Sequence, residues 1–180
     1  MLAVEYADEQ LVEQYVSKDR DDVNKRSPPL GRTPLHIAVS MDNIVIARLL
    51  LQNGAKIDEV SDDNLTALHI AVANQSIRMV ELLLKYGAMV KPVVVKFMRK
   101  TPLFMAVEYG NLEIARMLLD KGASVQESTV GTLSLVNLAF KSGNKDMMRL
   151  VLKYDVSGTL DLKDRIQGKH LIFINIYPVY

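Results

Sequence analysis

Apolar and polar residues follow a helical period along this chain, and the same pattern restarts about every 33 residues. The segment TPLHIA at residues 33–38 recurs as TALHIA at 66–71 and as TPLFMA at 101–106. A weaker copy, SLVNLA, follows at 134–139. Because each copy spaces its apolar residues three positions apart, each predicts one short helix with a single apolar face.

A second apolar run follows each copy at a constant distance. These runs read LLL at 49–51 and 82–84, MLL at 117–119 and LVL at 150–152. Turn-forming residues separate the two runs of a unit, as in Asp42-Asn43 and Gly110-Asn111. Each unit is therefore predicted to be a helix, a tight turn, a second helix and a loop that leads to the next unit.

The residues at the predicted helix ends fit these roles. Thr33 is expected to cap the first helix with its hydroxyl group, and Pro34 suits the first helical position, where no backbone N–H is needed. Gly54, Gly87 and Gly122 follow the second helices, where a left-handed residue is favoured, and Asp155 replaces the fourth glycine. One such helix pair cannot bury its apolar face alone, so neighbouring pairs must stack.

This pattern resembles the ankyrin-repeat family, whose signature is a 33-residue unit containing T-P-L-H-x-A, and the resemblance covers about residues 1–155. It implies an all-α solenoid of about five stacked helix-turn-helix pairs with projecting, hairpin-like finger loops. It also implies that His36 and His69 tie their units to neighbouring units by hydrogen bonds and have no catalytic role.

The two ends of the chain depart from the pattern. The segment AVEY at 3–6 repeats at 106–109, so the chain begins partway into a first helix. Residues 168–175, GKHLIFIN, are roughly in phase with residues 31–38, but Pro178 blocks a helix beyond them. The tail either covers the apolar face of the last repeat or is a truncation end, and we favour the covering role. We divide the chain into an N-terminal capping helix pair (1–25), three repeats (26–60, 61–95 and 96–128), a degenerate repeat (129–160) and a truncated repeat or C-terminal tail (161–180).

Composition narrows the function. The chain has no Cys, which excludes disulfides, thiolate metal sites and Cys nucleophiles. Its net charge of +1 creates no overall field that attracts nucleic acid or an anionic membrane. The N-terminus lacks a signal peptide, and no apolar run approaches the ~18 residues that span a bilayer. We expect a protein of the cytoplasm or the nucleus.

Motifs of enzymes and of metal or cofactor sites are missing from the sequence. The acids Asp58, Glu59, Asp62 and Asp63 lack EF-hand spacing, and we interpret them as a solvated finger loop. The basic segment 91–100 contains Phe97, a mixture that suits single-stranded nucleic acid, but the acidic second finger and the balanced charge argue against that partner. We expect no enzymatic activity, no metal, no cofactor and no small-molecule substrate.

The resemblance places binding on the concave side, which is built from the finger loops and the exposed part of each first helix. Segment 89–100 is the most unusual finger, because it is two residues longer than segment 56–65 and strongly apolar. The change from an acidic second unit to a basic third unit predicts a partner with the opposite order of charge. The candidate protein-binding residues are Leu30, Arg32, Met41, Asp62, Asp63, Leu65, Asn74, Phe97, Met98, Lys100, Glu108, Tyr109, Leu133 and Lys141.

The predicted function is that of a non-enzymatic protein-interaction module with a preorganised binding surface. Two narrower roles are alternatives. One is an inhibitor similar to the IκB-type ankyrin proteins, or a host-targeting effector, that masks a transcription factor or an enzyme. The other is a substrate-recruiting adaptor of a ubiquitin ligase, whose recruiting domain would lie outside this chain.

Overall fold

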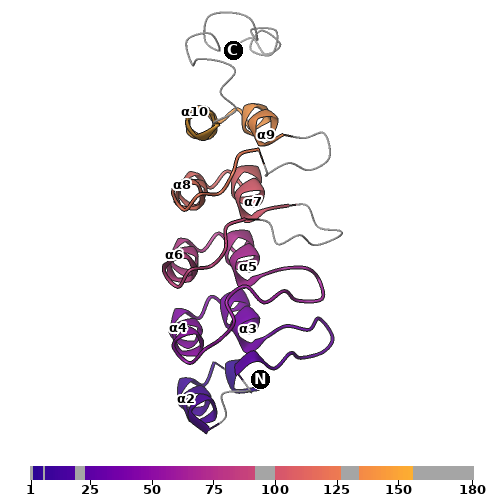
Figure 1. Cartoon of the computed structure of the whole chain (residues 1–180), viewed down its shortest axis with the longest axis vertical. Coiled ribbons are helices and arrows are strands. Elements are labelled where there is room, and N and C mark those ends of the chain that lie inside the picture. Colours follow the sequence, from indigo (N-terminus) through magenta and orange to yellow (C-terminus); the bar gives the residue numbers. More distant parts are fainter. Residues whose placement is uncertain (1, 6, 19–22, 92–99, 127–133, 156–180) are drawn as a thin grey trace, which may run out of the picture.

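Helices stacked in two parallel columns make up the protein (Figure 1). The computed structural model describes residues 2–5, 7–18, 23–91, 100–126 and 134–155. Within these ranges the only pairing of extended backbone is an isolated bridge between Ser27 and Arg32, so the all-α prediction is confirmed. The helix pairs are α1 (Leu2–Glu5) with α2 (Glu9–Lys18), α3 (Pro34–Ser40) with α4 (Ile44–Gln52), α5 (Ala67–Ala73) with α6 (Ile77–Lys85), α7 (Pro102–Glu108) with α8 (Leu112–Asp120), and α9 (Leu135–Lys141) with α10 (Lys145–Tyr154).

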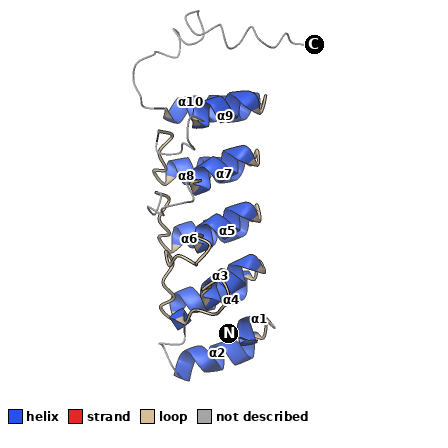
Figure 2. Cartoon of the chain, turned by 90° about the vertical axis from the view of Figure 1, so that its right-hand side faces the viewer, coloured by secondary structure: helices blue, strands red, loops and turns tan. Residues whose placement is uncertain are grey.

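The first helices of the pairs form an inner column beside the loops, and the second helices form an outer column (Figure 1). Within the inner column α1 packs on α3, α3 on α5, α5 on α7, and α7 on α9. The outer helices pack in the same order from α2 to α10. Viewed after a quarter turn, the pairs lie as layers one above another (Figure 2). This is the predicted solenoid of five helix pairs.

Local sequence determines where the helices begin and end. Thr33 lies in an extended conformation before α3, and its hydroxyl oxygen accepts a hydrogen bond from the backbone N–H of His36 at 3.4 Å. Asn43 caps α4 by accepting from the N–H of Ile46 at 3.0 Å. Gly54 and Gly87, after α4 and α6, have φ of 89° and 88°, the left-handed conformation predicted for them. The predicted helix caps and helix ends are therefore confirmed.

The core runs the full height of the described stack. Alanine at the sixth position of the repeated motif is at most 1% exposed in every unit, because only a small side chain lets neighbouring inner helices approach closely. Leucines of both helix columns fill the remaining space, each stabilising the fold by roughly 1.5–3 kcal/mol relative to an exposed leucine. The buried alanines of the motif are Ala38, Ala71, Ala106 and Ala139. The buried leucines include Leu35, Leu50, Leu68, Leu83, Leu103 and Leu118.

Candidate protein-binding surface

Four residues that cap the C-terminal ends of the inner helices occupy equivalent positions in successive units. Met41, Asn74, Tyr109 and Ser142 each follow the last residue of α3, α5, α7 and α9, and all four have right-handed helical backbone angles. Because the inner helices stack directly on one another, these residues form a row along the stack, which we call the C-cap row. Met41 is 44% exposed and Tyr109 is 45% exposed.

The Asn74 side chain has a structural role within this row. Its amide nitrogen donates to the carbonyl oxygens of Val39 at 3.2 Å and of Ser40 at 3.3 Å. Both acceptors lie at the C-terminal end of α3, where helix carbonyl groups lack partners inside the helix. Asn74 therefore ties the third helix pair to the second while remaining exposed at the surface.

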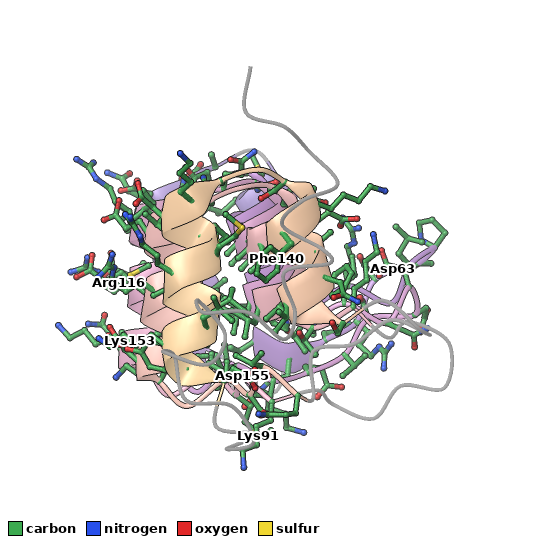
Figure 3. The ribbon with its side chains drawn as sticks, turned by 90° about the horizontal axis from the view of Figure 1, so that it is seen from above. Asp63, Lys91, Arg116, Phe140, Lys153 and Asp155 are labelled. Atoms are coloured by element: carbon green, nitrogen blue, oxygen red, sulfur yellow. The ribbon has the colours of Figure 1, made fainter. Side chains whose placement is uncertain are left out.

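The finger before α3 and the finger before α5 are joined by two ion pairs. The Arg26 guanidinium lies 2.6 Å from the Asp62 carboxylate, and Arg32 lies 2.9 Å from Asp63. The backbone N–H of Asp62 also donates to the carbonyl oxygen of Leu30 at 2.8 Å. Figure 3 shows Asp63 on the finger side of the stack, opposite the outer helices. The two fingers therefore form one connected surface.

The four acidic residues of this finger each contact another loop, although the Asp62 side chain remains 60% exposed, so the interpretation as a solvated loop is incomplete. Besides the pairs of Asp62 and Asp63, Glu59 lies 3.8 Å from Arg26. The carboxylate of Asp58 accepts from the backbone N–H of Met89 at 2.8 Å, across the boundary between the second and third helix pairs. Sequence spacing alone does not show which acid meets which base, because the loops project away from the helices that carry the period.

The electrostatics of Asp63 follow from its neighbours. Partial burial by itself raises the pKa of the Asp63 carboxyl group. Hydrogen bonds from Ser61 and Arg32, together with the Arg32 charge, outweigh that effect and lower the pKa below its ordinary value. The carboxylate is thus held in its charged form by residues of its own chain.

A glycine allows the two fingers to approach. Gly31 has φ of +58°, and a Cβ atom at this position would lie 2.5 Å from the Asp62 carboxylate and 2.5 Å from the Arg26 guanidinium. No side chain fits in that space without moving the ion pair. Sequence reasoning missed Arg26 and Gly31, although opposite charges about one repeat apart, such as Arg26 and Asp62, could have indicated the contact.

Two histidines connect successive units, as the family resemblance implied. The Nδ1 atom of His36 accepts from the backbone N–H of Thr33 at 3.2 Å, which leaves the proton on Nε2. Nε2 then donates to the carbonyl oxygen of Leu65, the last residue of the next finger, at 3.0 Å. His69 makes the equivalent bond to the Lys100 carbonyl oxygen. Burial lowers the pKa of His36, and it lowers the pKa of His69 to about 4, so both rings are neutral near pH 7.

The unit formed by α7 and α8 has a lysine contact in place of the histidine contact. Phe104 replaces the histidine of α3 and α5 and is fully buried. Lys100 lies with its ammonium group 5.8 Å from the centre of the Phe104 ring and 2.8 Å from both carboxylate oxygens of Glu108. Lys100 and Glu108, both predicted to meet a partner, therefore neutralise each other.

Among the described candidates, Met41, Asn74 and Tyr109 lie in the C-cap row, and ion pairs join Arg32 to Asp63 and Lys100 to Glu108. Leu30 and Lys141 are exposed, whereas Leu65 is half-buried and its carbonyl oxygen accepts the bond from His36. Phe97, Met98 and Leu133 lie outside the described residues, as does most of the unusual third finger. Five charged candidates, Arg32, Asp62, Asp63, Lys100 and Glu108, are engaged in ion pairs within the chain. The prediction that charge orients the partner is untested, and these pairs weaken its basis.

Within residues 2–5, 7–18, 23–91, 100–126 and 134–155, no three His, Asp or Glu side chains gather as metal ligands would. No helix in those ranges is both long enough and apolar enough to cross a membrane.

Comparison with known proteins supports the same assignment as the geometry. The sequence matches the profile of ankyrin repeats, three copies at a time, over residues 1–94 and 91–164. It is 31% identical over 129 residues to the ankyrin repeat protein FPV223 of fowlpox virus (strain NVSL), which covers 72% of this chain and 89% of the viral protein. These matches agree with the stacked helix pairs and with the buried histidines that bridge neighbouring units. The chain therefore belongs to the ankyrin-repeat family.

Proposed function

We propose that this chain binds a partner protein through the C-cap row and the finger before α3, without catalysing a reaction. Ankyrin repeats are generally protein–protein interaction modules. The observation that supports this surface is the exposure of Leu30, Met41 and Tyr109, which are 40%, 44% and 45% exposed beside a closed core. Exposed apolar side chains with charged residues around them are typical of protein interfaces.

The partner is expected to present apolar side chains to this surface. The pairs Arg26–Asp62, Arg32–Asp63 and Lys100–Glu108 are already formed within the chain, so an opposing charge on a partner would have to compete with them. Tyr is a frequent anchor at interfaces, and Met adapts its shape to an irregular surface. The C-cap row offers both types, Met41 and Tyr109, with Asn74 between them in the sequence of units.

Affinity capture with the full chain tests this proposal. The double variant Met41→Ser, Tyr109→Ser should lose the captured partner, because both apolar anchors are removed while the core is untouched. The matched control is Val45→Ser, since Val45 is 54% exposed but lies on the outer helix α4. Equal capture by the double variant and the wild type, with unchanged helical circular dichroism, would contradict the proposal.

The narrower roles stay predictions. An IκB-like inhibitor, a host-targeting effector and a ubiquitin-ligase adaptor would all use the same kind of surface, and identifying the captured partner separates them. The proposal includes a location in the cytoplasm or the nucleus, and it requires no cofactor.

A further inference from the structure

The described stack ends at α9 and α10 with an apolar face that is covered in every preceding unit. Phe140 of α9 is 38% exposed, whereas Val39, Val72 and Val107 at the equivalent positions are at most 1% exposed. Val136 is half-buried, but its equivalent Leu103 is fully buried. Figure 3, which looks down on this end, shows Phe140 between the two last helices.

The cause of the difference is the next layer. In the preceding units the inner helix of the following pair covers this position, as α5 covers α3 and α9 covers α7. An uncovered face of this kind loses the stabilisation that burial of a phenylalanine side chain provides. A terminal unit therefore needs a cover with a different composition or a neighbouring layer.

We propose that residues 168–176 of this same chain dock on this face as a partial further layer. The proposal does not depend on partner binding by the C-cap row. Three observations support it, and the first is the sequence register. The GKHLIFIN segment at 168–175 lies in phase with residues 31–38, so Ile172 corresponds to the fully buried Leu35.

The second observation is the spacing. Corresponding positions Thr33, Thr66, Thr101 and Ser134 are separated by 33, 35 and 33 residues, and His170 follows Ser134 after 36. The linker from α10 to this segment is therefore about as long as the loops that connect the described units. Because Asp155 directly follows α10 at this end of the stack (Figure 3), the tethered segment stays at a high local concentration near the face.

The third observation is that Asn137 of α9 has a hydrogen-bond donor at the position where His36 and His69 bond to the next unit. His36 and His69 each donate to the carbonyl group of the residue that precedes the next repeated motif, Leu65 and Lys100. Asn137 occupies the histidine position in α9, is exposed, and has an amide group that can donate in the same way. The residue at the matching position of the tail is Lys169.

The expected cover is partial. Asn175 stands where the other units have a small alanine, and Pro178 prevents a regular helix from continuing beyond the segment. The tail should therefore cover α9 more completely than α10. Met148 and Leu152 of α10 would remain half-buried, as they are in the described stack.

Chemical cross-linking tests the docking directly, because the chain has no cysteine of its own. In the full chain, the Asn137→Cys, Lys169→Cys pair treated with a short bismaleimide should give a monomeric internal cross-link. The control pair Val45→Cys, Lys169→Cys should not, since Val45 lies on the outer helix of the second pair. Failure of the first pair to link internally, or linkage only between two copies, would overturn the proposal.

A double-mutant cycle supplies an independent readout in the full chain. Phe140→Ser and Phe173→Ser should each lower the thermal midpoint, and the double variant should lower it by less than the sum of the two shifts. Additive shifts would mean that the α9 face and the tail segment stabilise the fold independently, which contradicts the docking. If Phe140→Ser prevents folding, the cross-linking variants still decide, because they leave both phenylalanines in place.

Discussion

The Nε2 atom of His36 lies 3.0 Å from the backbone carbonyl oxygen of Leu65, across the boundary between two helix pairs. The same ring accepts from Thr33 through Nδ1, so one side chain both caps its own helix and holds the neighbouring finger. This arrangement requires a neutral imidazole, because protonation of Nδ1 would remove the acceptor that Thr33 needs. Stability and proton binding are therefore linked.

The protein should lose stability as the pH falls from 6.5 towards 4. The pKa of His69 is about 4 in the folded protein against 6.5 for the free side chain, so within this window the unfolded chain binds more protons. The His69 contribution to the loss between pH 7 and pH 4.5 is roughly 2–3 kcal/mol. Urea unfolding of the wild type and of His69→Phe, the residue type found at position 104, measures it. A variant that loses as much stability as the wild type over this window would contradict the role of His69.

Replacing Gly31 with Ala should destabilise the protein more than the same change at Gly87. Both positions have positive φ, so both substitutions introduce backbone strain of about 1 kcal/mol. Only at Gly31 does the new Cβ meet the Arg26 and Asp62 side chains, whereas at Gly87 it meets nothing within 4 Å. Chemical denaturation of the two variants compares the costs. Equal costs would mean that the close approach of the fingers adds nothing to stability.

The Arg32–Asp63 pair should contribute measurably to stability, whereas the Asp146–Arg149 pair on α10 should not. Arg32 and Asp63 are each 28% exposed, but Arg149 and Asp146 are 79% and 69% exposed and thus well hydrated. Double-mutant cycles with Ala should give a coupling of about 1 kcal/mol for the first pair and near zero for the second. The first coupling should also fall as salt is added. Equal couplings would show that burial at the fingers does not matter.

The sequence predicted the elements of the fold well because their determinants are local. Thr33, Asn43 and Gly54 cap or end helices within a few residues of their own positions. Equivalent residues recur in the other units, so the sequence shows each signal several times. Contacts between loops were predicted poorly. The Arg26–Asp62 pair depends on the path of two fingers, and the structural bonds of Asn74 depend on how closely α3 and α5 pack. In one sequence such contacts are marked only by opposite charges about one repeat apart, as for Arg26 and Asp62, and not by the apolar period.

Binding of the partner should depend only weakly on salt. Asp62, Asp63 and Glu108 are paired with Arg26, Arg32 and Lys100 within the chain, so these charges are not free to form ion pairs with a partner. Once a partner has been captured, titration calorimetry between about 0.05 M and 0.3 M salt should change the affinity by less than about tenfold. A steep loss of affinity with salt would instead indicate a charged interface.

Site-specific photo-crosslinking tests the central claim most directly. A photoreactive phenylalanine analogue is placed at position 41, 109 or 45 of the full chain, and each protein is irradiated with the captured partner. We predict that positions 41 and 109 attach to the partner and that position 45, on the outer helix α4, does not. Attachment from position 45 alone would place the interface on the outer helices and contradict the account.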